Sequence, residues 1–221
     1  MEIKPIAHIV TDLATKFGVP RQSGVCNLRG RIVFEKEYRV ADAFRGLEGF
    51  SHIWLLWDFS EAHRDEWSPT VRPPRLGGNK RMGVFATRSP FRPNNIGLSS
   101  VRLVGIDYDT PDAPALIVEG VDLMNDTPIY DVKPYLPYTD IHSDAVGGFV
   151  EQKGDEPFRL QVRLTDELKK QLSAEQAATL ESVLSNDPRP HYHTDENRIY
   201  AMIYAGIEVR FRVVDGVVVV L

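Results

Sequence analysis

Residues 100–119 read SVRLVGIDYDTPDAPALIVE, and this stretch decides the fold class. Two short runs rich in β-branched and other apolar residues, 100–106 and 115–119, flank a cluster of Asp, Thr and Pro at 107–112 that is typical of a turn. Val101 and Leu103 lie on either side of Arg102, which is the partial alternation of a strand with one buried face. The stretch therefore predicts two strands joined by a turn.

Further short runs of the same character precede this stretch, each bounded by Gly, Pro, Asp or Asn. They are residues 6–10, 31–34, 52–57 and 82–86. In this half of the chain only residues 40–47 suggest a helix, with Gly46 as its C-cap. Many short strands at close spacing favour an antiparallel barrel over repeated βαβ units. We therefore expect a mainly β fold, with an antiparallel β-barrel domain over residues 1–150.

The sequence changes character near Gly147-Gly148 and again at 152–155. Beyond this point, leucines recur at multiples of four and form one apolar stripe, which predicts a helix. The leucines are Leu168, Leu172, Leu180 and Leu184. Thr165 is a candidate N-cap of this helix, and residues 187–190, with two prolines, end it.

The last segment of the chain predicts strands. Residues 199–204 and 207–214 are expected to pair, and Asp215-Gly216 predicts a tight turn before a final strand. We therefore expect a small α+β C-terminal domain over residues 151–221.

Length and composition exclude several protein classes. The chain has 221 residues, of which 43% are hydrophobic and 26% charged, as in ordinary globular proteins. The longest purely apolar run, residues 217–221, is far shorter than the roughly 20 residues that cross a bilayer, and residues 1–5 do not resemble a signal peptide. Cys26 is the single cysteine, so an internal disulfide and a cysteine-based zinc site are excluded. We expect a cytoplasmic protein without a membrane or metal partner.

Charge is distributed unevenly along the chain. The net charge is −5, yet the segment from Val71 to Arg102 holds seven basic residues and no acidic one. This leaves 19 of the 26 basic residues in the rest of the chain, against all 31 acidic residues. Such a block indicates a local anion-binding surface, as an RNA or phosphate site requires. The alternative is a solvated face paired with acids elsewhere, but arginines interleaved with Pro, Gly and Phe favour recognition of oxyanions and bases.

Residues 83–99 predict a strand that enters a loop with two prolines and two arginines, Arg88 and Arg92. Prolines restrict the backbone, so the loop could present these guanidinium groups in fixed directions. The same pattern suits a structural turn in which Asn94 and Asn95 adopt unusual backbone angles. The residues alone leave both interpretations open.

Residues 122–138 are the second informative stretch. Asp131 and Lys133 share a face if this segment is extended. Tyr130, Tyr135 and Tyr138 offer aromatic surface on which a nucleobase could stack, although tyrosines between prolines more often pack a loop.

Other catalytic patterns are weak or absent. His191 and His193 could face one side of a strand as metal ligands, but a third ligand is not evident, so we expect no metal. The chain lacks the glycine-rich fingerprints of Rossmann cofactor sites and P-loops, as well as the Gly-x-Ser-x-Gly turn of serine hydrolases.

Four segments closely resemble the TrmO (TsaA-like) family: residues 20–22, 69–79, 86–97 and 131–135. The resemblance covers residues 1 to about 145, and the tail resembles the C-terminal extension of bacterial members. It implies a methyltransferase that uses S-adenosylmethionine to methylate N6 of threonylcarbamoyladenosine at position 37, beside the anticodon of a threonine tRNA. It also implies a single β-barrel unrelated to Rossmann methyltransferases, acting as a homodimer with the cofactor near the subunit interface.

The resemblance also carries over site residues by position. Those implied to contact S-adenosylmethionine are Gln22, Ser23, Gly24, Ser60, Glu61, Arg88, Leu98, Asp126, Thr127, Pro128 and Ile129. The chain departs from the pattern familiar in bacterial members at Ser23 and Asn95, where Pro is familiar, and at Asp126, where Gly is common. Ser60-Glu61 replaces His-Gln, so contacts through the backbone are expected there.

The implied chemistry assigns further roles. The N6 atom of the modified base carries a carbonyl group, so removal of its proton during attack predicts a general base. Asp131 and Tyr135 are the candidates, with Lys133 favouring the ionised form of the tyrosine. Arg88 or Arg92 suits the threonyl carboxylate of the substrate, and Leu98 and Ile129 would offer apolar walls to the cofactor. The residues expected to bind tRNA are Arg72, Arg75, Lys80, Arg81 and Arg92.

Two other functions compete with methyl transfer. The barrel could hold anticodon-loop RNA without catalysis, or its Asp and Tyr residues could hydrolyse a nucleotide ester. Neither has a motif of its own in this sequence, so we rank both below methyl transfer.

Overall fold

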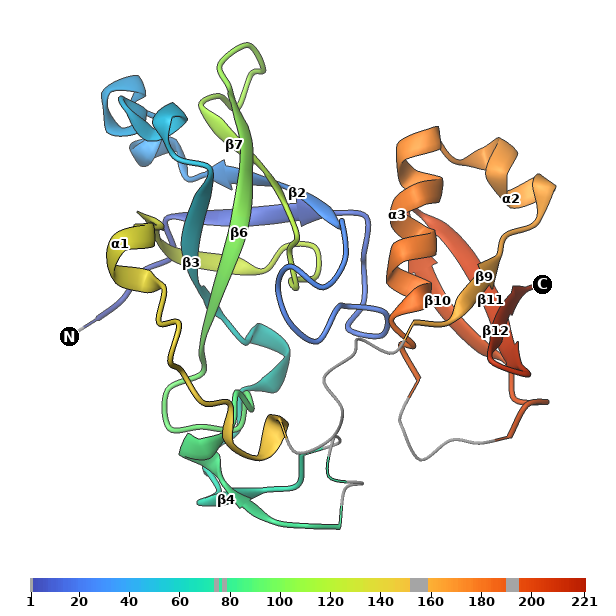
Figure 1. Ribbon diagram of the computed structural model, residues 1–221. Coiled ribbons are helices and arrows are strands. Elements are labelled where there is room, and N and C mark those ends of the chain that lie inside the picture. The colour runs from blue at the N-terminus through green and yellow to red at the C-terminus, as the bar shows by residue number, and fades with distance from the viewer. Residues whose placement is uncertain (1, 74–75, 77–78, 152–158, 190–194) are drawn as a thin grey trace.

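In the computed structural model, described here for residues 2–73, 76, 79–151, 159–189 and 195–221, six strands close into a barrel (Figure 1). Neighbouring strands are antiparallel throughout, in the order β1-β2-β7-β6-β3-β8. Their bounds are β1 (Ala7–Thr11), β2 (Arg29–Phe34), β3 (His52–Asp58), β6 (Ile96–Asp107), β7 (Ala115–Glu119) and β8 (Pro128–Pro134). The prediction of a mainly β fold with an antiparallel barrel is confirmed.

Alternating side chains of these strands fill the barrel. On β3, Ile53, Leu55 and Trp57 point inward and are buried, as the period of two requires. Each such side chain stabilises the fold by about 1.5–3 kcal/mol through its removal from water. Trp57 lies directly against Gly97 of β6, where a Cβ atom would come within 2.2 Å of the indole ring. Glycine is therefore the residue that lets this ring pack.

Two of the elements expected in the N-terminal half differ from the structure. Residues 82–86 form only the two-residue strand β5 (Met82–Gly83), paired with β4 (Thr70–Val71), before a 3₁₀ turn at Val84–Ala86. Residues 40–47 do not form an α-helix, because Gly46 at φ 88° separates two 3₁₀ turns, Ala41–Phe44 and Leu47–Gly49.

Strand β8 was not predicted, and its ends explain why. Pro128 and Pro134 mark its two ends, where a missing N–H interrupts the ladder least. Between them the strand pairs with β1 on one side and β3 on the other, with a bulge between Leu56 and Trp57 of β3. After β8 the chain enters the short helix α1 (Pro137–Asp140).

The C-terminal unit is a four-stranded sheet in the order β10-β11-β12-β9, covered by helices (Figure 1). Its elements are β9 (Gln161–Arg163), α2 (Asp166–Gln171), α3 (Ala174–Ser185), β10 (Tyr200–Tyr204), β11 (Ile207–Val214) and β12 (Val217–Val220). The expected α+β character and the pairing of β10 with β11 are confirmed. Asp215 and Gly216 both have positive φ, as the predicted tight turn requires. The domain boundary near residue 150 stays a prediction.

The single helix expected from Thr165 onward is instead two helices. Thr165 caps α2 as predicted, since its hydroxyl accepts a hydrogen bond from the Leu168 N–H. The chain then breaks because Ser173 and Gln176 form a capping box that starts α3. None of the helices in the described residues has the length and apolar character that crossing a bilayer requires.

Antiparallel closure gathers the connections at two ends of the barrel. One end carries the connections 12–28, 59–95 and 120–127, and we call it the long-loop end. The opposite end carries the connections 35–51 and 108–114 and the chain after β8.

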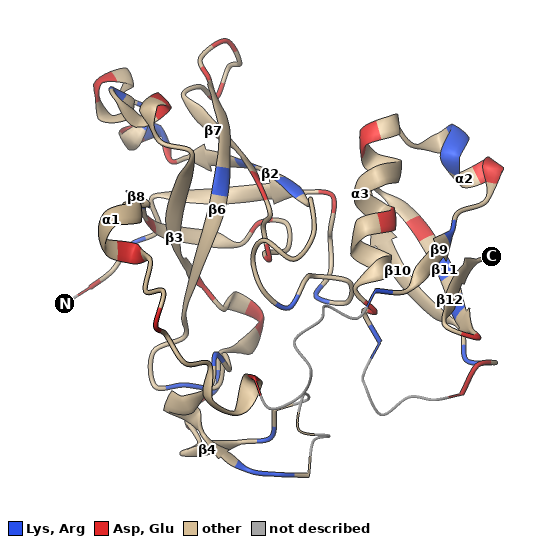
Figure 2. Cartoon of the chain, viewed as in Figure 1, with Lys and Arg blue, Asp and Glu red and all other residues tan. Residues whose placement is uncertain are grey.

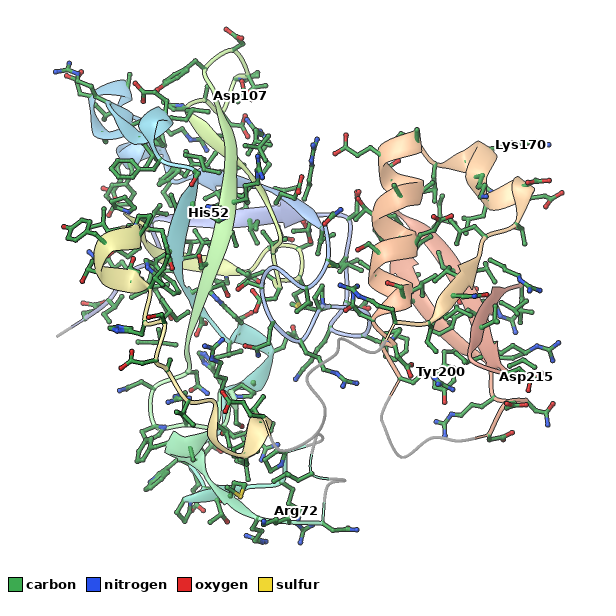
Figure 3. All side chains as sticks on the ribbon, viewed as in Figure 1. His52, Arg72, Asp107, Lys170, Tyr200 and Asp215 are labelled. Atoms are coloured by element: carbon green, nitrogen blue, oxygen red, sulfur yellow. The ribbon has the colours of Figure 1, made fainter. Side chains whose placement is uncertain are left out.

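Charge separates between these two ends. Blue segments lie along the β4–β5 hairpin at the long-loop end (Figure 2). Arg72 on this hairpin and Asp107 at the end of β6 mark opposite ends of the molecule in Figure 3. The field of the barrel therefore favours approach of an anion to the long-loop end.

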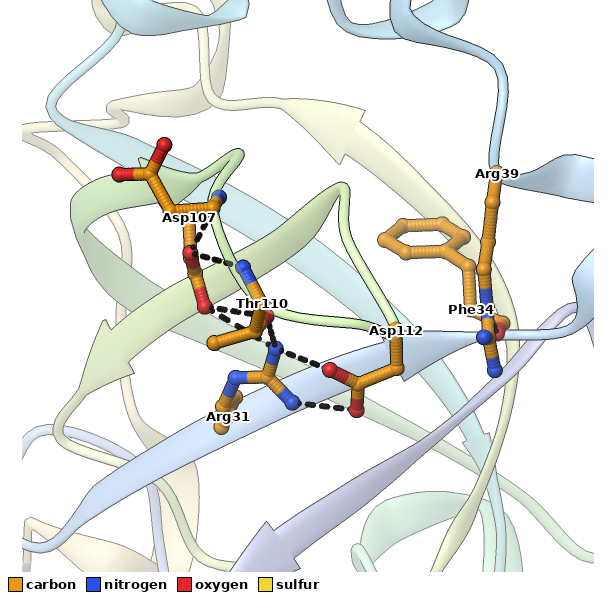
Figure 4. A network of polar contacts seen from close by, with 7 residues as sticks. Arg31, Phe34, Arg39, Asp107, Thr110 and Asp112 are labelled. Atoms are coloured by element: carbon orange, nitrogen blue, oxygen red, sulfur yellow. Dashed lines mark hydrogen bonds and ion pairs between the residues drawn. The ribbon is translucent and has the colours of Figure 1, made fainter.

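The turn between β6 and β7 is held by Arg31 (Figure 4). Its guanidinium contacts Asp112 at 2.6 Å and Asp107 at 3.0 Å. Hydrogen bonds from the Asp109 N–H, the Thr110 hydroxyl and Arg31 lower the pKa of Asp107 to about 2. This network confirms the turn predicted at 107–112 and gives it a partner on β2.

Candidate functional site

The residues that the family resemblance assigns to the cofactor gather at the long-loop end. Gln22, Ser23 and Gly24 lie in the connection 12–28, whereas Ser60, Glu61 and Arg88 lie in the connection 59–95. Leu98 is near the start of β6, and residues 126–129 lead into β8. The predicted cofactor residues therefore come from three loops and two adjoining strands at one end of the barrel.

Contacts join these loops around a partly buried carboxylate, Asp122. It accepts hydrogen bonds from the Ser99 hydroxyl at 2.6 Å and from the Ser23 backbone N–H, and Trp57 Nε1 donates to the same Ser99 oxygen at 3.0 Å. Burial raises the pKa of Asp122, although its hydrogen bonds and the charge of Arg88 oppose the shift. Asp122 thus connects the barrel core with two of the three loops.

Arg88 and Gln22 complete this arrangement. Arg88 Nη1 donates to Gln22 Oε1 at 2.5 Å, across 66 positions of sequence. Gly24 donates its N–H to the Gly120 carbonyl at 2.8 Å and has φ 75°, a conformation that glycine adopts without strain. We call Gln22, Ser23, Gly24, Arg88 and Asp122 the Asp122 cluster.

Residues 126–129 are joined to strand β1 and its flank through backbone hydrogen bonds. Thr127 and Ile129 are buried, and the Thr127 hydroxyl donates to the Met124 carbonyl at 2.8 Å. The side chain of Ile129 packs in the barrel core, and its carbonyl accepts a hydrogen bond from the Ile6 N–H at 2.8 Å. Asp126 has φ 61°, which explains why glycine suits this position and why aspartate, tolerant of that region, can replace it.

Of the three residues expected to act on the substrate, Asp131 and Lys133 lie on β8 and Tyr135 directly follows it. Lys133 Nζ contacts Asp131 Oδ2 at 3.0 Å, so the two residues share a face as predicted. In the sheet, Asp131 pairs with Leu56 of β3, and Leu56 pairs on its other side with Leu98 of β6. Leu98 is 56% exposed, so these three paired residues lie on the outer face of the barrel, beside the long-loop end.

Tyr135 lies further from the predicted cofactor residues than Asp131 does. It follows the last residue of β8, four positions and about 13 Å of strand beyond Asp131. Its ring lies against Trp54 and His52, with centroid separations of 5.5 and 6.2 Å. Tyr135 therefore lies toward the opposite end of the barrel.

An additional polar group beside Ser60 and Glu61 was not anticipated. His63 Nε2 contacts Asp58 Oδ1 at 2.7 Å, and the Tyr130 hydroxyl also hydrogen-bonds to Asp58. Burial, with a smaller effect of the Asp58 charge, raises the pKa of Tyr130. The Asp58 carboxylate at the end of β3 thus holds the 3₁₀ turn Ser60–Ala62 close to the start of β8.

The residues predicted to bind tRNA fall into two groups. Arg72, Lys80 and Arg81 are exposed on the β4–β5 hairpin, whereas Arg75 lies outside the described residues. Arg92 is half-buried and donates to the backbone carbonyl of Thr87 at 3.2 Å, so it also braces its own loop.

Metal ligands can be assessed only in part. His191 and His193 lie outside the described residues. Within the described part of the chain, the side chains form no group of three or more His, Cys, Asp or Glu that could hold a metal ion.

The C-terminal unit packs on the loop 12–28, which carries part of the Asp122 cluster. Arg159 and Asn186 both donate to the Val25 carbonyl, at 2.6 and 3.2 Å. Phe17 of the same loop stacks on Tyr200 and Phe211, with centroid separations of 6.1 and 6.3 Å. The loop 12–28 is therefore held by the barrel on one side and by the C-terminal unit on the other.

Sequence comparisons agree with this architecture. The family model for the N-terminal domain of tRNA-methyltransferase O matches residues 8–141, and that for the TrmO C-terminal domain matches residues 157–221. The chain is 40% identical to the tRNA (adenine(37)-N6)-methyltransferase of Escherichia coli (strain K12), over 97% of this chain and 94% of that protein. It is 38% identical to a putative S-adenosylmethionine-dependent methyltransferase, RcsF, of Pseudomonas aeruginosa, over 88% of this chain and 84% of that one.

A solved structure matches the whole fold. The crystal structure of TrmO from Pseudomonas aeruginosa superposes with a TM-score of 0.79 at 30% sequence identity, covering 100% of this chain and 97% of that chain. Both the barrel and the C-terminal unit of this chain therefore have counterparts in that structure. The chain belongs to the TrmO family of tRNA methyltransferases.

Proposed function

We propose that this chain, acting as a cytoplasmic homodimer, methylates N6 of threonylcarbamoyladenosine at position 37 of threonine tRNA, with S-adenosylmethionine as methyl donor. Membership of the TrmO family and the names of its relatives support methylation of adenine 37. The observation that carries the proposal is the gathering of the assigned cofactor residues at the long-loop end, where Gln22, Ser23 and Arg88 are linked through the Asp122 cluster.

The residues at this end suit S-adenosylmethionine. Arg88 is an exposed guanidinium that matches a methionine carboxylate, and Leu98 is an exposed apolar side chain near the start of β6. The exposed side chain of Asp126 offers carboxylate oxygens that can accept hydrogen bonds from a nucleoside. When bound, S-adenosylmethionine supplies a methyl group made electrophilic by its positively charged sulfur.

The chain's own residues contribute positioning and proton transfer. Holding N6 in line with the methyl group removes most of the entropic barrier to a displacement between two bound molecules. Asp131 accepts the N6 proton, and its contact with Lys133 at 3.0 Å keeps the carboxylate oriented on the outer face of β8. Arg92 matches the threonyl carboxylate, since its planar guanidinium can pair with both oxygens.

A second copy of the chain suits the outer face of β6. Leu98 and Val104 point outward from this strand and are 56% and 45% exposed. A subunit contact on this face would remove Leu98, which lies beside the long-loop end, from water. In this arrangement the cofactor lies close to the contact between subunits.

The test is a methylation assay on purified protein with S-adenosylmethionine. Threonine tRNA with and without the threonylcarbamoyl group is offered, and the nucleosides are identified by mass. We expect a methylated product only from the threonylcarbamoylated tRNA. Equal methylation of both tRNAs would contradict the substrate assignment, and tRNA binding without any methyl transfer would favour a non-catalytic RNA-binding module.

A further inference from the structure

Two large aromatic side chains are exposed side by side at the long-loop end. Trp67 is 52% exposed and Phe85 is 73% exposed. Their ring centroids are 6.2 Å apart and the rings are inclined by 25°, so the rings are nearly parallel. Exposed aromatic surface of this size favours a binding partner, because water does not solvate it well.

The β4–β5 hairpin fixes this pair. Thr70 is level with Gly83 in the ladder, and the Val84 N–H donates to the Pro69 carbonyl at 3.0 Å. Trp67 and Phe85 therefore emerge from the two sides of the hairpin base. The backbone contacts hold both rings without help from a ligand.

The other end of the same hairpin carries cations. Arg72, Lys80 and Arg81 are exposed there, and none of them makes an ion pair within the described residues. Asp65 and Glu66, by contrast, directly precede Trp67. This arrangement favours phosphate groups along the hairpin and an uncharged, planar group on the rings.

We infer that Trp67 and Phe85 form a platform on which an unpaired base of the substrate tRNA stacks while the hairpin cations contact neighbouring phosphates. The inference rests on the proposed function, because it adds a recognition surface for the same substrate. Base stacking on aromatic side chains tolerates any base, so the platform would hold the anticodon loop without reading its sequence. Exposed cations beside exposed aromatic rings match the phosphates and bases of an RNA strand, which favours RNA over a second chain.

The experiment compares two variants with the wild-type protein. Trp67→Ala combined with Phe85→Ala removes both rings, whereas Trp67→Phe keeps an aromatic pair. Binding of the anticodon stem-loop of threonine tRNA is measured at several salt concentrations. We expect about five- to hundredfold weaker binding for the double variant and less than about threefold for Trp67→Phe.

Two further readouts separate stacking from charge effects. The slope of log K against log salt stays unchanged in the double variant, but falls by roughly 0.7 to 0.9 for each of Arg72, Lys80 and Arg81 replaced by Ala. The stem-loop quenches tryptophan fluorescence in the wild-type protein, and Trp67→Phe loses this quenching. Both rings are exposed, so the melting temperature of each variant should match that of the wild type.

Each outcome either supports the platform or overturns it. Wild-type affinity in the double variant, or quenching that survives Trp67→Phe, overturns it, as does a change of oligomeric state that marks the pair as a subunit contact. If the wild-type chain methylates the tRNA and the double variant binds as tightly, only the platform is wrong. If the wild-type chain neither binds nor methylates the tRNA, the proposed function fails as well.

Discussion

Asp122 accepts hydrogen bonds from Ser99 and Ser23, which belong to different parts of the chain, and it faces the charge of Arg88. Asp122→Asn keeps the size of the side chain but removes its charge and replaces one acceptor oxygen with a donor. Hydrogen bonds to a charged group contribute about 1.5–3 kcal/mol, so loosening this cluster should weaken S-adenosylmethionine binding about tenfold or more. Isothermal titration calorimetry measures this, with the exposed Asp109→Asn at the opposite barrel end as control. Equal affinities of the two variants would show that Asp122 does not position the cofactor site.

Asp131 and Tyr135 are separated by the structure although they are close in sequence. Asp131 is level with Leu98, whereas Tyr135 lies beyond the end of β8. We expect Asp131→Asn to lower kcat by about a hundredfold or more, the usual contribution of a general base, and Tyr135→Phe to lower it less than about threefold. S-adenosylmethionine affinity should stay unchanged in both. A large loss of kcat in Tyr135→Phe alone would reverse the assignment.

The roles of single residues were harder to predict from the sequence than the strands were. The residue-by-residue resemblance assigned the cofactor residues, and Asp131 and Lys133 could be placed on one face by their spacing. Asp122 was missed because its partners Ser23 and Ser99 lie far away in the sequence. A lone carboxylate between the apolar residues Val121 and Leu123, shortly after a strand, was the signal that could have pointed to it.

At the scale of elements, local periodicity predicted most barrel strands because side chains alternate between core and solvent. The same reasoning missed β8, since its prolines suggested a loop. It also merged α2 and α3, because one apolar stripe continues across the capping box at Ser173. The Ser-x-x-Gln pattern at residues 173–176 was the sequence signal that could have separated the two helices.

The β6–β7 turn leads to a prediction about acid stability. Hydrogen bonds from Asp109, Thr110 and Arg31 lower the pKa of Asp107 from 3.8 to about 2. The folded state therefore binds its proton less readily than the unfolded state, and the stabilisation is present above about pH 4 and disappears as the pH falls toward 2. Asp107→Asn should reduce the free energy of unfolding at pH 7 but not at pH 2, as measured by urea denaturation. A constant difference between the two proteins at both pH values would contradict this linkage.

At the scale of the whole molecule, the two units meet at the loop that carries part of the Asp122 cluster. The contacts are a β-bridge between Leu13 and Tyr204 and the hydrogen bonds to the Val25 carbonyl. One side of the loop 12–28 thus depends on residues that lie more than a hundred positions later in the chain. Cofactor affinity should therefore respond to substitutions in the C-terminal unit that touch no ligand.

The combination of Arg159→Ala and Asn186→Ala tests this dependence. It removes both side-chain donors to the Val25 carbonyl, each contributing about 1 kcal/mol, while the stacking of Phe17 still joins the units. We expect roughly tenfold weaker S-adenosylmethionine binding by calorimetry and faster hydrogen exchange at the amides of residues 21–25, since the loop can open locally without unfolding the barrel.

Arg163→Ala is the matched control, because Arg163 is an exposed arginine on β9 of the same unit. If exchange quickens in the double variant while affinity stays equal to that of the control, the C-terminal unit stabilises the loop without tuning the cofactor site. Unchanged exchange would mean that the two hydrogen bonds to the Val25 carbonyl do not hold residues 21–25.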